Sequence, residues 1–206
     1  RCFATLVFSN RSNGKGSATR SIDLSVNNPP RVTNSSVQAG AVVSTGAFTY
    51  VAQFRDRLMA STLDSSDFPL RGLVTGTVSP TNWNYNTNTA TLTLNYGILP
   101  EDEYTLTLYS GDGRFEDVDG MDLDGEASAW PIPPNVSGNG VQGGDFSLTF
   151  SVDALTVAYP TPMAAKRPAG SLIYDPIVTA YVRPTGDVDQ FTLSVDAGQT
   201  ITVVVD

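Results

Sequence analysis

Two segments of this chain alternate between apolar and polar residues, and this pattern constrains the fold more than any other feature. In residues 89–94 and 104–109, Thr separates successive Ala, Leu or Tyr positions as far as Leu108. A period of two places successive side chains on opposite faces of a strand, so one face is buried while the Thr face meets water. No stretch keeps a helical period over the roughly three or four turns of an ordinary helix. The sequence therefore predicts an all-β protein.

The predicted strands follow one another at short, nearly regular intervals with turn residues between them, which is typical of an antiparallel β-sandwich. In the middle of the chain we expect strands at 47–55, 68–74, 88–95, 103–110 and 145–152, with a weaker one at 76–83. Residues 96–102 are predicted to be a turn. Residues 58–66 are predicted to form one short helical turn.

Turn and proline signals divide the chain into four parts. Two alternating segments, 3–9 and 20–26, flank an Asn-Gly turn signal and predict a hairpin, and two prolines follow it. We interpret 1–28 as the C-terminal hairpin of a preceding β-repeat, 29–153 as a complete sandwich, 154–170 as a linker and 171–206 as the N-terminal part of another β-domain. In this last part we expect strands at 177–182, 188–195 and 200–205. Neither end resembles a natural terminus, so we expect a segment of a longer polypeptide.

The composition excludes several kinds of chemistry. The chain has no histidine and one cysteine, Cys2, so it can build neither a Ser-His-Asp set nor a His- or Cys-based zinc site. We find no catalytic arrangement of the remaining groups and predict that the chain is not an enzyme. Its net charge is −9, from 12 Lys and Arg against 21 Asp and Glu, which argues against nucleic acid as a partner. Its apolar runs are well short of the ~18 residues of a membrane span.

Residues 112–126 form an acidic segment with seven carboxylates in fifteen positions. Two Asp-x-Asp-Gly motifs, 117–120 and 122–125, lie five residues apart. Ca²⁺ prefers about six to eight oxygens from spaced carboxylates and carbonyls, and glycines let a chain fold around the ion. The segment is no EF-hand, because Phe115 stands at the first ligand position and no helices flank it. Two interpretations stay open, a calcium-stabilised loop and a solvated acidic turn. The candidate ligands are Asp117, Asp119, Asp122, Asp124 and Glu126.

Trp83 and Tyr85 alternate with asparagines in residues 82–86. One interpretation is a sugar-binding platform, in which the rings stack on a sugar and the amides bond its hydroxyls. The other is that the aromatic rings pack against a sheet while the asparagines form turns. Trp130, which precedes Pro131, allows the same two interpretations.

Several spaced motifs in residues 29–153 agree with one known family. Tyr-Thr-Leu stands at 104–106, Asp-x-x-Gly-x-x-Leu-Asp-Gly at 117–125, and a closing strand runs through 143–150 to Val152 and Asp153. Together with the opening at 29–32 and the strand at 48–54, these motifs resemble the bacterial Ig-like domain of surface-layer proteins. The resemblance implies an antiparallel Ig-like β-sandwich, flanked here by partial β-sandwich modules. Residues 127–136 are an insert relative to that pattern.

The C-terminal part contains an Asp-x-Asp-x-Phe strand within 186–193 and an Ala-Gly-Gln-Thr turn within 197–203. These residues resemble the opening of the bacterial pre-peptidase C-terminal domain, a small β-sandwich appended to secreted hydrolases and surface proteins. The N-terminal hairpin resembles the last two strands of a polycystic-kidney-disease-type repeat.

These resemblances imply an exported bacterial protein with many modules, extracellular or on the cell surface. In it this segment is expected to be a non-catalytic structural or adhesive module that spaces or presents its neighbours, with Ca²⁺ as a candidate stabilising ion. The expected partners are neighbouring β-modules of the same polypeptide, and then polysaccharide or other copies of the chain. Two alternatives remain: an accessory carbohydrate- or protein-binding region of a secreted hydrolase or protease, and a fibre subunit assembled by strand complementation.

Overall fold

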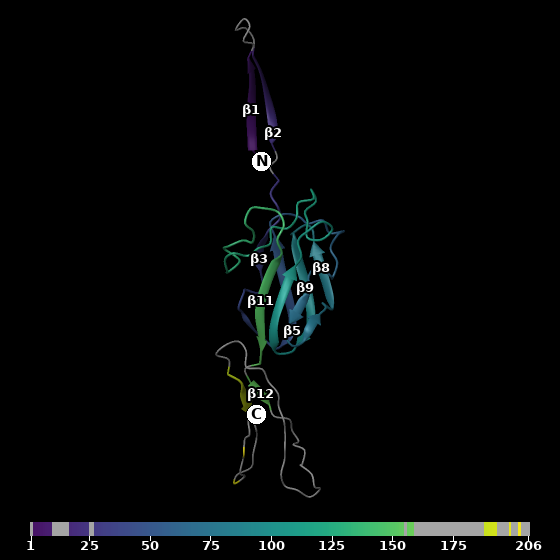
Figure 1. Cartoon of the computed structure of the whole chain (residues 1–206), viewed down its shortest axis with the longest axis vertical. Helices are drawn as coiled ribbons and strands as arrows, with labels where there is room; N and C mark the ends of the chain where they lie inside the picture. Colours follow the sequence, from purple (N-terminus) through teal and green to yellow (C-terminus); the bar gives the residue numbers. More distant parts are fainter. Residues whose placement is uncertain are drawn as a thin grey trace.

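The computed structural model describes residues 2–9, 17–24, 27–154, 156–158 and 188–192, together with Gly198 and Thr202. The regular secondary structure of these described residues consists of β-strands, and no helix is present among them (Figure 1). The all-β prediction is therefore confirmed. No helix of the described part is long and apolar enough to span a membrane.

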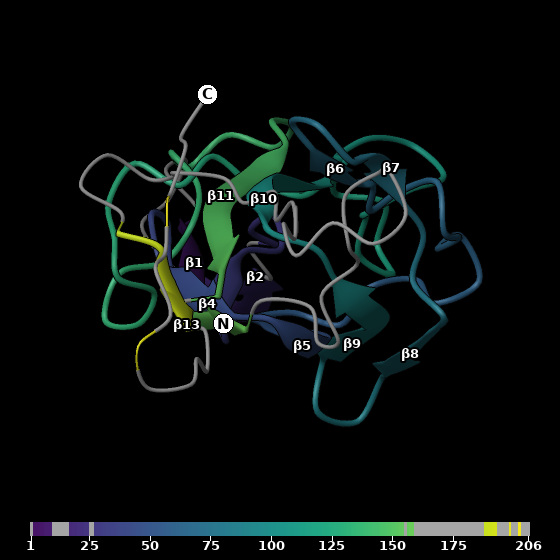
Figure 2. The ribbon, with the colours of Figure 1, turned by 90° about the horizontal axis from the view of Figure 1, so that it is seen from below.

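Two sheets pack face to face to form a β-sandwich (Figure 2). The first is antiparallel, with the order β3-β5-β9-β8. Its strands are β3 (Val32–Ser35), β5 (Gly46–Phe54), β9 (Thr91–Leu99) and β8 (Asn82–Asn86). The second has the order β4-β11-β10-β6-β7, and only its β4–β11 pair is parallel. Its strands are β4 (Val42–Ser44), β11 (Phe146–Asp153), β10 (Asp102–Leu108), β6 (Leu70–Gly72) and β7 (Gly76–Val78).

The alternating pattern places the core between the two sheets. Along β10, and along β9 as far as Tyr96, every second residue is buried, while the Thr residues between them are only half-buried. Phe150 of β11 stacks between Phe48 and Tyr104, with ring centroids 4.9 and 5.8 Å away. On the outer face the hydroxyls of Thr105 and Thr149 lie 3.2 Å apart. The core thus consists of the apolar half of each alternating strand.

Two local predictions were wrong, and one part of an open interpretation is corrected as well. Strand β9 continues through Tyr96 to Leu99, so the predicted turn at 96–102 shrinks to the residues just before β10. A register shift in β5 between Ala47 and Thr49 keeps the two strands paired over this extra length. Residues 58–66 form turns instead of a helical turn, because a bridge to Asp117 holds the buried Leu58 in extended backbone. Residues 82–86, where one interpretation placed turns, form β8.

Outside the sandwich the structure describes two short pairs of strands. β1 (Cys2–Ser9) pairs antiparallel with β2 (Ser17–Leu24), which confirms the predicted hairpin although its second strand begins earlier. β12 (Thr156–Ala158) pairs parallel with β13 (Gln190–Thr192), so a strand lies within the stretch predicted as a linker. Its Thr-Val sequence favours extended backbone. The strand predicted at 177–182, and all but Thr202 of that at 200–205, lie outside the described residues.

The insert at 127–136 covers the outer edge of β3. The carbonyl of Ile132, a fully buried residue, accepts hydrogen bonds from the Ser35 amide (3.3 Å) and from Gln38 Nε2 (2.9 Å). Just beyond the insert, Ser137 bonds the Val32 carbonyl through its amide and accepts the Val32 amide at its hydroxyl. Because an open edge is a template for unwanted strand pairing, the insert protects this side of the sheet.

Asp102 ties the start of β10 to the turn between β6 and β7. Its Oδ2 accepts the amides of Val74 (2.9 Å) and Thr75 (2.7 Å), and its Oδ1 accepts the amide of Glu103. Burial alone raises the pKa of Asp102, but these amides outweigh burial and hold the pKa below its usual value of 3.8. The charged form is therefore favoured in the folded state.

We expect this tie to be acid-sensitive. Because the folded-state pKa is depressed, its stabilisation is complete above the unfolded-state pKa and is lost as the pH falls through the lower folded value. Asp102→Asn should therefore cost about 1–3 kcal/mol of unfolding free energy at pH 7, and its deficit relative to the wild type should shrink below about pH 3.8. Urea unfolding at several pH values measures this. A deficit that stays constant from pH 7 to pH 2 contradicts the assignment.

Candidate functional site

The acidic segment lies between β10 and β11, at the end of the sandwich that we call the acidic end. Phe115 and Leu123 are fully buried in the core, and the Leu123 amide donates to the Phe115 carbonyl at 2.8 Å. Short bridges also join Ser110 to Phe115 and Glu116 to Asp122. The backbone of the segment is therefore fixed at several points.

Asp117 caps a turn of this segment. Its Oδ1 accepts the amides of Asp119 and Met121, both at 2.9 Å, and its Oδ2 accepts Asn27 Nδ2 at 3.0 Å. Only 3% of Asp117 is exposed, whereas Asp119 is exposed. These hydrogen bonds use both oxygens of Asp117 in local structure.

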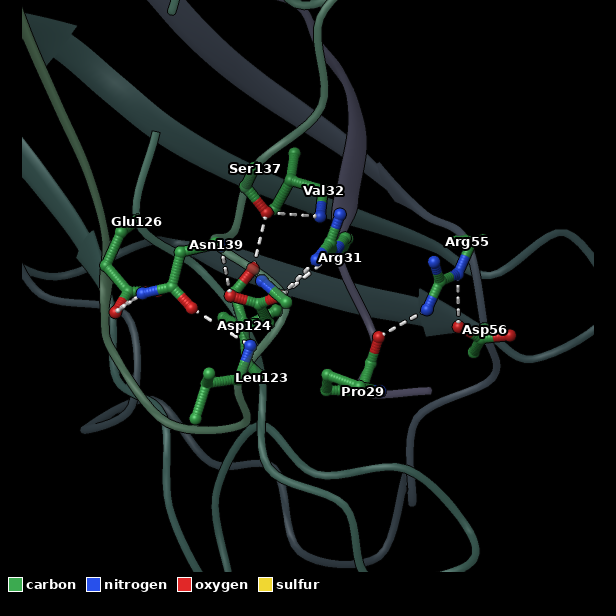
Figure 3. A network of polar contacts seen from close by, with 12 residues as sticks. Pro29, Arg31, Val32, Arg55, Asp56, Leu123, Asp124, Glu126, Ser137 and Asn139 are labelled. Carbon is green, nitrogen blue, oxygen red and sulfur yellow. Dashed lines mark hydrogen bonds and ion pairs between the residues drawn. The ribbon is translucent and has the colours of Figure 1, made fainter. Parts of the chain in front are cut away.

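Asp124 is the centre of a buried polar network (Figure 3). Its Oδ2 meets Arg31 Nη2 at 2.6 Å and Nε at 2.8 Å, and also accepts the Gly140 amide at 2.9 Å. Its Oδ1 accepts the Asn139 amide at 2.7 Å. Four donors thus surround this fully buried carboxylate, which joins the start of the sandwich to residues 138–140. Glu126, which is exposed, accepts Asn139 Nδ2 at 3.3 Å.

A different set of carboxylates comes together in the segment. One oxygen from each of Asp112, Glu116 and Asp122 lies within 4.8 Å of the others. Glu116 is only 9% exposed, and Oδ1 of Asp122 is buried and accepts no hydrogen bond. Burial, followed by the charges of Asp112 and Glu116, raises the pKa of Asp122. Of the five predicted ligands, the structure brings only Asp122 into this group.

The sequence interpretation missed Asp112 and Glu116 because it followed the two Asp-x-Asp-Gly motifs. Both residues belong to the same acidic segment, so carboxylate density was the available signal. A second group, Glu101, Asp153 and Asp189, was also missed. Its members are far apart in the sequence, and no local motif indicates that they meet.

Trp83 and Tyr85 are half-buried and pack against the core from β8. The Trp83 ring meets Phe68 edge-on at 5.2 Å, and the Tyr85 ring meets Phe54 at 6.3 Å. The Tyr85 hydroxyl also accepts the Leu58 amide at 2.8 Å. Both rings thus contribute to packing. Trp130 likewise packs against Phe146, with ring centroids 5.8 Å apart.

The described residues define the class of protein as an all-β sandwich module with a structured acidic segment at one end. No protein-family model and no curated protein matches the chain. Among solved structures, it is similar to the N-terminal part of the bacterial S-layer protein SbsC, with a TM-score of 0.36 and 13% identity. The match covers 66% of this chain and 25% of that one, and at this TM-score it supports no functional argument. The pre-peptidase resemblance of 171–206 stays a prediction.

Proposed function

We propose that this chain is a non-catalytic structural module of a large secreted or cell-surface bacterial protein, in which it spaces and presents neighbouring β-modules. The observation that supports the proposal most is the path of the chain through the sandwich. β3 begins with Val32 paired to Phe54, at the acidic end. β11 ends at Asp153, at the opposite end (Figure 1). The residue before it, Val152, pairs with Asp102, the first residue of β10. A module that is entered at one end and left at the other holds its neighbours apart.

The length of β11 sets the spacing. Its eight residues span about 27 Å at roughly 3.4 Å per residue. The entering chain is anchored beside β3, where the Pro29 carbonyl accepts Arg55 Nη2 at 2.6 Å and Arg31 pairs with Asp124 (Figure 3). The entering end of the chain is thus attached to the sandwich by both contacts.

The direction of the end strands favours resistance to pulling. Tension on the two ends draws β3 and β11 along their own axes and in opposite directions. The force then acts at the same time on all the hydrogen bonds between β3 and β5. It likewise acts together on the hydrogen bonds that join β11 to β10 and to β4. A strand peeled from one end instead breaks these bonds one after another. The proposed spacer therefore has the geometry that a load-bearing module needs.

Force spectroscopy tests this proposal. Pulled through its two ends, the module of residues 29–153 should unfold with a gain in length of about 400 Å. The control attaches one handle at the entering end and the other at Val141, an exposed position that also lies at the acidic end, so that pulling peels β3 and β10 from their neighbours one hydrogen bond at a time. We expect a clearly higher unfolding force in the end-to-end geometry. Equal forces in the two geometries would contradict the load-bearing proposal.

The outward-facing residues of β5, β9 and β8 form an uncharged surface, which is a candidate surface for adhesive contacts. The outward residues of β5, β9 and β8 stand in cross-strand rows of amide, hydroxyl and aliphatic side chains. These rows are Gln53–Thr91–Asn86, Val51–Thr93–Asn84 and Thr49–Asn95–Asn82. Amides and hydroxyls both donate and accept hydrogen bonds, so the face suits a neutral polysaccharide or another copy of the chain. We keep both as candidate partners beside the neighbouring modules.

A further inference from the structure

The group formed by Asp112, Glu116 and Asp122 has a charge that the described structure leaves uncompensated. None of the three ion pairs among the described residues involves it. The nearest arginine in sequence, Arg114, instead approaches Asp67 at 3.9 Å and lies over the Tyr109 ring. Three carboxylates within 4.8 Å of one another repel strongly unless a cation joins them.

A second observation concerns Asp122 itself. Its Oδ1 is shielded from solvent and accepts no hydrogen bond. The backbone amide of Asp122 donates to Gln142 Oε1 at 3.3 Å, and this bond does not involve the carboxylate. Such an atom is rare in folded proteins, because an unsatisfied buried acceptor costs about 1–3 kcal/mol. Glu116 beside it is 91% buried, with one amide, that of Gly113, bonded to Oε1 at 3.2 Å. Glu116 is thus largely buried, and Asp122, which is half-buried, has one oxygen that is closed to water and that no described side chain bonds.

We propose that Asp112, Glu116 and Asp122 bind one divalent cation of the size of Ca²⁺. One oxygen of each carboxylate lies within 4.8 Å of the others, which is close enough for a single ion to contact all three. Ca²⁺ accepts about six to eight oxygens at roughly 2.3–2.6 Å in irregular arrangements, whereas Mg²⁺ demands near-octahedral geometry at about 2.0–2.1 Å. Three carboxylates carried by one irregular segment therefore suit Ca²⁺ better than Mg²⁺.

The backbone around the group makes the site largely preformed. Glu116 and Asp122 pair in a short bridge, and Phe115, directly before Glu116, is fully buried in the core. Three carboxylates provide three of about six to eight oxygens, and water or carbonyl oxygens complete the shell. The ion would fasten residues 112–122 and make the acidic end more rigid. A module can space its neighbours with or without this ion, so the inference stands apart from the proposed function.

The test uses the full 206-residue chain after removal of metals with EDTA. Titration calorimetry with CaCl₂ should show binding at one site. Thermal unfolding should shift upward by about 5–10 °C at a hundredfold excess over Kd. Glu116→Gln and Asp122→Asn should each weaken Ca²⁺ binding by at least about tenfold. In EDTA the same variants should melt at or above the wild-type temperature, because they relieve repulsion. This change of sign separates a metal site from ordinary loss of structure.

The matched control is Asp119→Asn, which removes the same charge from an exposed position of the same segment but outside the group. It should leave Ca²⁺ binding unchanged. Asp112→Asn, at an exposed position, provides a further ligand variant should Glu116→Gln fail to fold. The proposal is overturned by a wild type that neither binds Ca²⁺ nor shifts its melting temperature. It is equally overturned if Asp189→Asn abolishes binding and Asp122→Asn does not, because the ion would then lie in the second group.

Discussion

Replacement of Asp124 by alanine is expected to lower the free energy of unfolding by about 3–5 kcal/mol, as for other buried ion pairs that lose one partner. The carboxylate is fully buried and receives Arg31 together with the amides of Asn139 and Gly140. The substitution leaves a guanidinium that is 21% exposed without its counter-ion, and two amides without an acceptor. The expected loss of unfolding free energy therefore includes the unsatisfied donors as well as the lost ion pair.

Urea unfolding of the wild type and three variants checks this expectation. Asp124→Asn keeps the shape and one acceptor, so it should fall between the wild type and Asp124→Ala. Asp119→Ala removes an exposed carboxylate from the same segment and should change stability by less than about 0.5 kcal/mol. If Asp124→Ala costs less than 1 kcal/mol, the network does not hold the start of the sandwich to residues 138–140.

The fold was largely predictable because its main signal is local. In β9 and β10 the Thr and Leu alternation states directly which face is buried, and the structure follows it residue by residue. Strand ends were harder to predict. β9 extends past Tyr96 because β5 shifts register opposite it, and this adjustment depends on a strand more than 40 positions away. The same alternation was present in residues 82–86, where Trp and Tyr point inward and Asn outward.

The chemistry of the acidic segment was predictable only in outline. Asp122 and Asp124 belong to one Asp-x-Asp-Gly motif, and the sequence offers no reason to treat them differently. In the structure Asp124 is bonded to Arg31, 93 positions earlier in the chain, whereas Asp122 faces two other carboxylates. The density of carboxylates in the sequence predicts only that this segment is acidic. Long-range partners decide which of these carboxylates accept hydrogen bonds and which, like Oδ1 of Asp122, accept none.

Phe115→Ala is expected to have an effect of similar size, about 3–5 kcal/mol, and it connects the core to the proposed site. The ring is fully buried, 5.7 Å from Phe54 and 6.4 Å from Phe68, so its loss opens a cavity where both sheets meet the acidic segment. Glu116 follows directly in the chain, and its position depends on this anchor. We therefore expect Phe115→Ala to weaken Ca²⁺ binding together with stability, while Phe115→Leu, which keeps most of the volume, loses less than half as much of each. Denaturant unfolding and calorimetry on the two variants measure both quantities. A Phe115→Ala variant that loses stability but binds Ca²⁺ like the wild type would show that the carboxylates hold their arrangement without the core.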